Sequence, residues 1–213
     1  MPRRYSMGKR MVQEAETRRR IVEATMALHR ELGVIRVKPT DIAARANVAV
    51  TTYYKHFHTL GDLVRACTGR GRELFPPPEP ASLMELPPHR AVRIPAMVRT
   101  LFDFYELREP YIYVSRTEER LVPELQSAAD RLRGLRDAFV NAALGPAQTD
   151  RQGIGVATAL VDFWAWRTLR RELDLTQEEV IGFVTTAVQR AAGIAVPDER
   201  AGPLAPPTTA GSA

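Results

Sequence analysis

Hydroxyl, phenol and ammonium groups gather within one short stretch of this sequence. Thr51, Thr52, Tyr54 and Lys55 stand close together in segment 50–56. A threonine offers a hydroxyl and a methyl group, which suit base edges and the thymine methyl of DNA. Tyrosine and lysine side chains can bind phosphate oxygens and fix register. These residue types indicate contacts with DNA, provided that the segment is a helix with these side chains facing outward.

The surrounding pattern predicts two short helices joined by a tight turn. The first, Pro39 to Ala46, begins with a proline, whose missing N–H costs nothing in the first turn. Asn47 interrupts it, and asparagine tolerates the left-handed backbone that ends many helices. The second runs from about Val50 to His56. This is the arrangement of a helix-turn-helix, whose second helix can lie in the major groove.

Three further residues complete the predicted DNA contacts. Lys38 and Thr40 stand where the N-terminus of the first helix can approach phosphate, and Val50 can add an apolar base contact. No Arg, Asn or Gln occupies the outer face of the second helix, so this face lacks the side chains that usually form bidentate hydrogen bonds with a base. We therefore expect much of the specificity to come from DNA shape and spacing, and some from the N-terminal arm.

The stretch resembles the DNA-binding domain of the tetracycline-repressor (TetR) family of bacterial regulators, over about residues 17–67. The matching residues are Gly33, Asp41-Ile42-Ala43, Asn47-Val48-Ala49, Thr52-Tyr53-Tyr54-Lys55-His56-Phe57 and Leu63. The departures are Asn47 for a turn glycine, Ala49 for a capping serine, Tyr53 for a leucine and Leu60 for a phosphate-contacting lysine. The resemblance implies an all-α chain, with an N-terminal three-helix helix-turn-helix domain and a C-terminal helical ligand-binding and dimerisation domain.

Charge is unevenly distributed along the 213 residues. Residues 1–72 hold 15 Lys and Arg against 6 Asp and Glu, whereas residues 73–213 hold 15 against 19, giving +5 overall. A basic first third fits a DNA-binding module joined to a separate second domain, and a solvated basic surface is the alternative.

Composition bounds the class and location of the protein. Cys67 is the single cysteine, which excludes an intramolecular disulfide. No apolar run approaches the ~20 residues of a membrane span, and the basic N-terminus lacks the apolar stretch of a signal peptide. These features favour a cytoplasmic protein.

We expect five parts in the chain. They are a basic disordered arm (1–16), a helix-turn-helix domain with its linking helix (17–75), a proline-rich linker (76–88), a helical second domain (89–195) and a disordered tail (196–213). The arm can contact DNA or be a mobile tail without a role. Thr17 to Leu32 is expected to be the first helix, and Thr59 with Asp62 is expected to cap a later one.

The second domain is predicted to be wholly helical. Its expected helices are 90–107, a short segment 110–116, 122–143, 151–172 and 177–192, the last capped by Thr176 and Glu179. The last helix is apolar over a wide face that needs cover on two sides. Because the resemblance implies a homodimer through the final two helices, one side can be covered by a partner; the alternative is that both faces are internal.

Aromatic residues of the second domain are the candidates for binding an effector. Phe102, Tyr105, Tyr111, Tyr113 and Trp164 lie on segments that enclose the effector cavity in the family. Arg116, Glu118 or Glu119 could anchor a charged ligand. For each aromatic residue taken singly, ordinary core packing is the alternative, because effector cavities and cores are both apolar.

Enzyme and metal chemistry find no support in the sequence. No catalytic or phosphate-binding motif is present, and His56 and His58, two residues apart, diverge on a helix. We predict no catalytic residue, no metal and no cofactor. The expected function is sequence-specific transcriptional regulation on a palindromic operator, as a repressor relieved by a small apolar or amphipathic effector. The alternative is a helical DNA-binding regulator without an effector, controlled by a protein partner.

Overall fold

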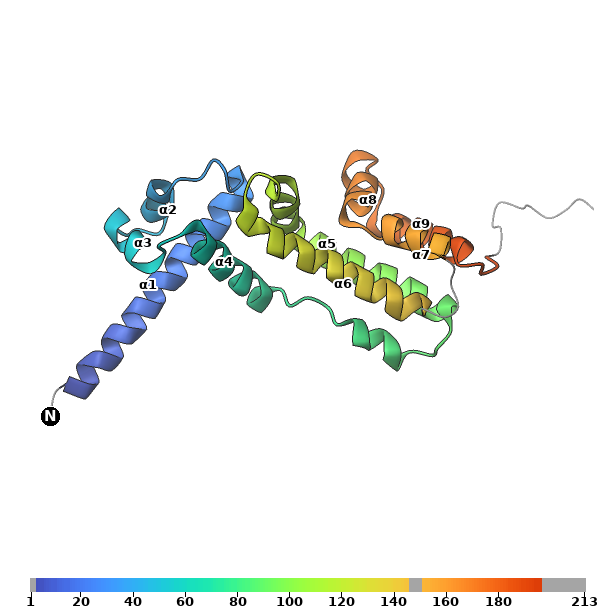
Figure 1. The fold of residues 1–213 in the computed structure, drawn as a ribbon, viewed down its shortest axis with the longest axis horizontal. Coiled ribbons are helices and arrows are strands. Elements are labelled where there is room, and N and C mark those ends of the chain that lie inside the picture. The colour runs from blue at the N-terminus through green and yellow to red at the C-terminus, as the bar shows by residue number, and fades with distance from the viewer. Residues whose placement is uncertain (1–2, 146–150, 197–213) are drawn as a thin grey trace, which may run out of the picture.

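A computed structural model describes residues 3–145 and 151–196, with side chains from residue 8 onward. These residues form helices without any strand, which confirms the all-α fold class. The helix-turn-helix domain, α1 to α4, lies at one end of an elongated molecule, α5 and α6 run side by side along its middle, and α7 to α9 lie toward the other end (Figure 1). The elements in order are α1 (Arg3–Leu32), α2 (Pro39–Arg45), α3 (Val50–His56), α4 (Leu60–Leu74), η1 (Pro80–Glu85), α5 (Arg90–Glu118), η2 (Pro123–Leu125), α6 (Gln126–Leu144), α7 (Arg151–Leu160), α8 (Phe163–Arg167), η3 (Thr168–Glu172) and α9 (Gln177–Ala191).

The first helix is longer than predicted. It begins at Arg3, so the expectation of a disordered arm over residues 1–16 is wrong for the described part of that segment. Thr17 therefore lies inside the helix, where its hydroxyl donates to the Gln13 carbonyl one turn earlier at 2.9 Å. Arg19 pairs with Glu16 at 2.6 Å and so ties the expected arm to the next turn. The N-terminal end of α1 projects past α2 and α3 in Figure 1.

The helix-turn-helix agrees closely with its prediction. The bounds of α2 and α3 match those expected to within one residue. Asn47 ends α2 with a φ of 52°, in the left-handed region, as predicted. Thr59 caps α4 by accepting the Asp62 N–H at 3.1 Å, while the Asp62 carboxylate accepts the Thr59 N–H at 3.2 Å. The sequence therefore predicted both local geometry and element order here.

The proline-rich segment is a packed strap. It contains the 3₁₀ helix η1, which packs on α6 and buries Leu83. Prolines restrict the backbone of this segment, and two contacts hold it against the bundle: the burial of Leu83 and the hydrogen bond from Arg93 of α5 to the Leu86 carbonyl at 3.1 Å. Figure 1 shows this strap running below α6, between α4 and α5.

The helix α5 joins two segments that were predicted to be separate. It runs from Arg90 to Glu118 through both Pro95 and Pro110. Its buried face packs on α6 and α9. Tertiary packing therefore outweighs the lost backbone hydrogen bonds and ring clashes that a proline causes inside a helix.

A single helix over 151–172 is a prediction that the structure corrects. The helix α7 ends at Leu160, and Asp162 starts α8 by accepting the Trp164 N–H at 3.0 Å. A π-helical turn, η3, follows α8. The cause is local, because an aspartate carboxylate competes for backbone N–H groups and favours a new helix start.

The last helix is covered largely by its own chain. Val180, Ile181, Val184 and Val188 of α9 are buried against α5 and α7, so the two apolar sets do not both await a partner. The predicted Thr176 cap is confirmed, with the Thr176 N–H donating to Glu179 at 2.8 Å. The predicted tail, apart from Val196, lies outside the described residues.

Candidate DNA-binding surface and effector cavity

The helix α3 is held by a small core beneath it. Tyr53 and Phe57 are buried with Ile42 of α2 against α1 and α4. The Arg18 guanidinium lies over the Phe57 ring, 4.6 Å from its centre. Arg20 donates to the Ala46 carbonyl at 3.2 Å and so satisfies the C-terminal end of α2. These contacts fix which face of α3 points outward.

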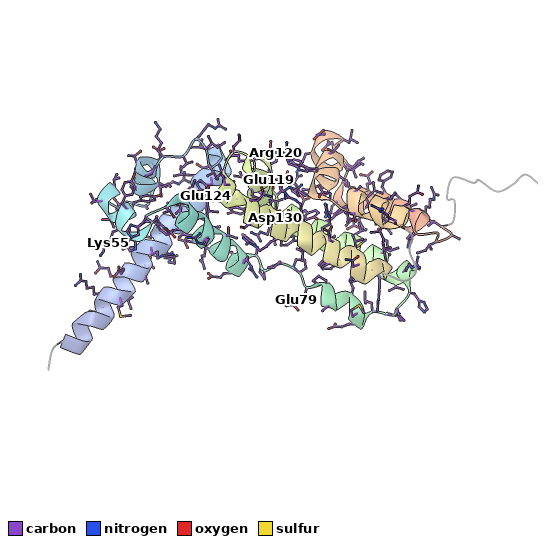
Figure 2. The ribbon with its side chains drawn as sticks, viewed as in Figure 1. Lys55, Glu79, Glu119, Arg120, Glu124 and Asp130 are labelled. Atoms are coloured by element: carbon purple, nitrogen blue, oxygen red, sulfur yellow. The ribbon has the colours of Figure 1, made fainter. Side chains whose placement is uncertain are left out.

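The candidate DNA contacts lie at the surface of this domain. Val50, Thr51, Tyr54 and Lys55 are exposed on α3, and Thr52 beside them is half-buried. Lys38 and Thr40 are also exposed, at the start of α2. Figure 2 shows Lys55 at the outer end of the molecule, away from the bundle of α5 and α6. The exposure of these residues allows the predicted contacts, which remain a prediction.

Three local features affect this surface. Ala49 precedes α3 with an extended backbone but has no side chain that can cap it. Lys55 Nζ lies 3.8 Å from a Glu14 carboxylate oxygen of α1, so a phosphate would compete with that carboxylate for the ammonium. Asp41 satisfies the backbone at Lys38, accepting its N–H at 3.0 Å.

A partly enclosed cavity of about 370 Å³ lies between the helix-turn-helix domain and the second domain. We call it the junction cavity. Such a volume is in the range of sites for small organic molecules. Four helices contribute most of its wall: α1 (Met26, His29, Arg30), α4 (Val64, Cys67, Thr68, Gly71, Arg72), α5 (Phe104, Arg108, Pro110, Tyr111, Ile112, Val114, Ser115) and α6 (Ala128, Arg131, Leu132, Leu135), with Val34, Pro77 and Leu125 between them.

Two titratable groups in the wall are uncharged near neutral pH. Burial lowers the pKa of His29 to about 4, so its imidazole is neutral. Burial raises the pKa of the Cys67 thiol to about 12, so it stays protonated. The charge of the junction cavity therefore comes from its arginines.

Only one predicted ligand residue, Tyr111, lines the junction cavity. Phe102 and Tyr105 are instead fully buried in the core of the second domain. The Tyr105 hydroxyl donates to the Val161 carbonyl at 3.1 Å, and its ring meets Trp166 edge-on at 5.9 Å. For these two residues the structure shows core packing, the alternative that the sequence left open.

The other three predicted ligand residues form a separate group near the break between α7 and α8. The rings of Tyr113 and Trp164 meet edge-on at 5.9 Å, and Arg167 lies 4.4 Å over the Tyr113 ring. Arg116 faces Asp162 at 3.7 Å. These side chains already have partners, and none of them borders the junction cavity.

The arginines of the cavity wall were not among the predicted ligand residues, although the sequence contains one signal for them. Arg30, Arg72, Arg108 and Arg131 have no acidic residue three or four positions away in either direction. On a helix these are the positions that pair charges. By contrast, Arg133 has Asp130 at that spacing. An arginine without a helical partner is a candidate for binding something else.

The described residues contain no group of three His, Cys, Asp or Glu side chains placed to hold a metal ion. Within the same part of the chain, no helix combines the length and apolarity that crossing a membrane requires.

Comparison with known proteins gives relatives of one kind. No protein-family model matches the sequence. The chain is 27% identical over 184 residues to the HTH-type transcriptional repressor KstR of Rhodococcus jostii (strain RHA1), covering 79% of this chain and 84% of that protein. This relative is named as a transcriptional repressor and not as an enzyme.

Solved structures share the fold. A putative TetR-family transcriptional regulator from Syntrophomonas wolfei superposes with a TM-score of 0.58 at 15% identity, covering 86% of this chain and 99% of that one. The multidrug binding protein EbrR in complex with imidazole superposes with a TM-score of 0.55 at 21% identity, covering 86% of this chain and 97% of that one. The chain therefore has the fold of TetR-family regulators, as its sequence resemblance implied.

Proposed function

We propose that this chain, with its TetR-family fold, is a sequence-specific transcriptional repressor whose binding to DNA is relieved by a small molecule. The observation that carries the proposal is the outward polar face of α3, held in position by the buried Tyr53 and Phe57. Its relative from Rhodococcus jostii is named a transcriptional repressor, which agrees with this function.

The proposed DNA contacts follow from side-chain chemistry. Thr51 and Thr52 would meet base edges, with Val50 against an apolar group such as a thymine methyl. Tyr54 and Lys55 would bind phosphates from α3, and Lys38 and Thr40 would bind phosphates from the start of α2. Since α1 is helical from Arg3, any contact by its basic end would come from a helix rather than from a flexible arm.

The junction cavity supports control by a small molecule over control by a protein partner alone. Its wall is shared between the DNA-binding helices α1 and α4 and the second-domain helices α5 and α6. A ligand that fits one relative placement of these helices better than another would shift the population between them. That shift would change the spacing of two α3 helices in a dimer and thus their match to the operator.

A homodimer through the outer face of α7 and α9 would supply the second α3. Phe183 of α9 is 57% exposed, although it is a large apolar side chain. Gly155 of α7 and Gly182 of α9 have open space where a side chain would stand, which allows close approach of another helix pair. A twofold axis through this surface would bury Phe183 against its copy or the neighbouring helix.

The function is tested by selecting duplexes from a random pool with the purified full chain. We expect a palindromic consensus, with affinity that falls when Thr51→Ala and Thr52→Ala are combined. Thr117→Ala, an exposed threonine on α5, is the control and should leave affinity unchanged. A pool without any enriched sequence, or full affinity in the double variant, would contradict the proposed mode of readout.

A further inference from the structure

We propose that the junction cavity binds an amphipathic anion, with a carboxylate or phosphate head held by arginines and an apolar body inside the cavity. The proposal rests on the effector function proposed above and names the chemical class of the ligand. It is carried by the position, pairing and surroundings of four arginines that the proposed DNA contacts do not use.

Each of the four helices around the cavity contributes one arginine. Arg30 comes from α1, Arg72 from α4, Arg108 from α5 and Arg131 from α6. None of the described residues that line the cavity is Asp or Glu. Four guanidinium groups around one opening repel each other and produce a strongly positive local potential, which an anion would relieve.

These arginines differ from their neighbours on the same helices. On α6, Arg133 pairs with Glu119 at 2.9 Å and Arg136 with Asp162 at 2.5 Å, whereas Arg131 pairs with no carboxylate of the described chain. On α5, Glu106 and Glu109 pair with arginines of α8 and η3. These four carboxylates of the second domain are thus paired with other arginines, and the cavity arginines are in no ion pair with a carboxylate of the described residues.

Arg108 is the interior member of the set. It is half-buried, its Nη1 donates to the Phe75 carbonyl at a long 3.4 Å, and its Nε is buried with no partner among the described atoms. The guanidinium has room because residue 71 is glycine: a Cβ there would stand 3.0 Å from Nη2. A partly buried cation with unused donors is costly unless an acceptor arrives.

Helix ends offer a structural explanation for only half of the set. Arg30 and Arg72 lie in the last turns of α1 and α4, where a cation stabilises the helix dipole. Arg108 and Arg131 lie inside α5 and α6, where that explanation does not apply. These two arginines therefore carry the argument for a bound anion.

The rest of the wall is suited to an apolar body. Its apolar side chains include Phe104, Ile112, Val114, Leu125, Leu132 and Leu135. His29 and Cys67 add only uncharged polar groups, because burial keeps the imidazole neutral and the thiol protonated. A ligand that satisfies both the arginines and this surface has a charged head and a hydrocarbon body.

The test compares four ten-carbon amphipaths by titration calorimetry with the full chain. Decanoate and decyl phosphate carry the two candidate anionic heads, and the difference between them tells a carboxylate site from a phosphate site. Decanol is neutral and decyltrimethylammonium is a cation. We expect at least one anion to bind roughly tenfold or more tightly than decanol, since charge-assisted hydrogen bonds are the stronger ones. The cation should bind worst.

Two variants assign the binding to the arginines. Arg108→Met should remove most of the preference for the anion over decanol. Arg99→Met, on the same helix but in a surface pair with Glu178, should keep it. If a thermal melt shows that Arg108→Met is unfolded, Arg72→Met combined with Arg131→Met takes its place. Both of these side chains are exposed, and their loss should weaken anion binding several-fold.

The outcomes separate this inference from the proposed function. Decanol or the cation binding as tightly as the anions, and releasing selected DNA, would overturn the ligand class while supporting control by a small molecule. Failure of all four probes to bind would overturn the anionic site, and the duplex selection would still decide the DNA-binding function. An unchanged preference in a folded Arg108→Met protein would also overturn the inference.

Discussion

Glu118, the last residue of α5, holds the loop that leads into the helix-turn-helix. Its carboxylate accepts the backbone N–H of Val34 at 2.7 Å and that of Ile35 at 3.1 Å. The loop turns at Gly33, whose φ of 81° suits glycine and whose missing side chain makes room for the carboxylate. Since α5 also lines the junction cavity, this contact joins the cavity wall to the DNA-binding domain.

Removing this carboxylate should loosen the junction. We expect Glu118→Ala to lower the free energy of unfolding by about 1–3 kcal/mol, because the buried Val34 loses its charged acceptor. Urea unfolding followed by circular dichroism measures the change. Glu124→Ala is the control: Glu124 is exposed in η2 (Figure 2) next to Gly61 of α4, and its loss should change little. Equal stabilities of the two variants would remove the assigned role from Glu118.

A serine at the start of α3 should stabilise the recognition helix. Ala49 already has the extended backbone of a capping position, with φ −68° and ψ 147°, but no oxygen to accept an N–H. We expect Ala49→Ser to raise the free energy of unfolding by about 1 kcal/mol. Ala44→Ser, exposed inside α2, should have the opposite sign, since serine is a poorer helix former than alanine. Thermal melts of both variants check the prediction.

His29 should make the protein less stable in acid. Its pKa is about 4 in the folded chain because of burial, against an ordinary value near 6.5. Below about pH 6.5 the unfolded chain takes up a proton at His29 that the folded chain does not. The contribution of neutral His29 to the free energy of unfolding is therefore fully present above that pH, and it is lost as the pH falls to about 4. The loss attributable to this one group is about 3 kcal/mol.

Unfolding curves across this pH range test the role of His29. The His29→Gln variant should show a smaller loss of stability between pH 6.5 and pH 4 than the parent. The side chains that share the wall with His29, including Cys67, Arg108 and Tyr111, contain no carboxylate that would favour its protonation. His58→Gln, in an exposed position, should keep the parent's slope. A parent-like slope in His29→Gln would place the pH dependence elsewhere.

A charge on the outer face of α9 should separate the proposed dimer. We expect Phe183→Glu to give a monomer by light scattering. Its affinity for a palindromic operator should fall at least tenfold, because the second half-site no longer binds in the same event. Leu107→Glu is the matched control, since Leu107 is also 57% exposed but lies on α5. Dimers that persist in Phe183→Glu would exclude this surface as the interface.

The sequence by itself determined the helix-turn-helix. Pro39, Asn47 and the Thr59–Asp62 pair start and end helices through contacts within a few residues, so their effect can be predicted without a tertiary structure. The exposed face of α3 follows from the same local periodicity. The resemblance to the TetR family rests on other residues of the same stretch, such as Asp41-Ile42-Ala43 and Thr52 to Phe57, and the chain shares the fold of TetR-family structures.

Only the tertiary structure decided where the second domain is continuous and where it is hollow. The helix α5 continues through Pro110 while its buried face packs on α6 and α9, although a proline favours a break at that point. Phe102 and Tyr111 are both aromatic residues on α5, yet one is core and the other lines the cavity. Their environments depend on helices far away in sequence, as do the arginines gathered from four helices. Local sequence patterns do not specify contacts between residues far apart in the chain, and such contacts form the cavity.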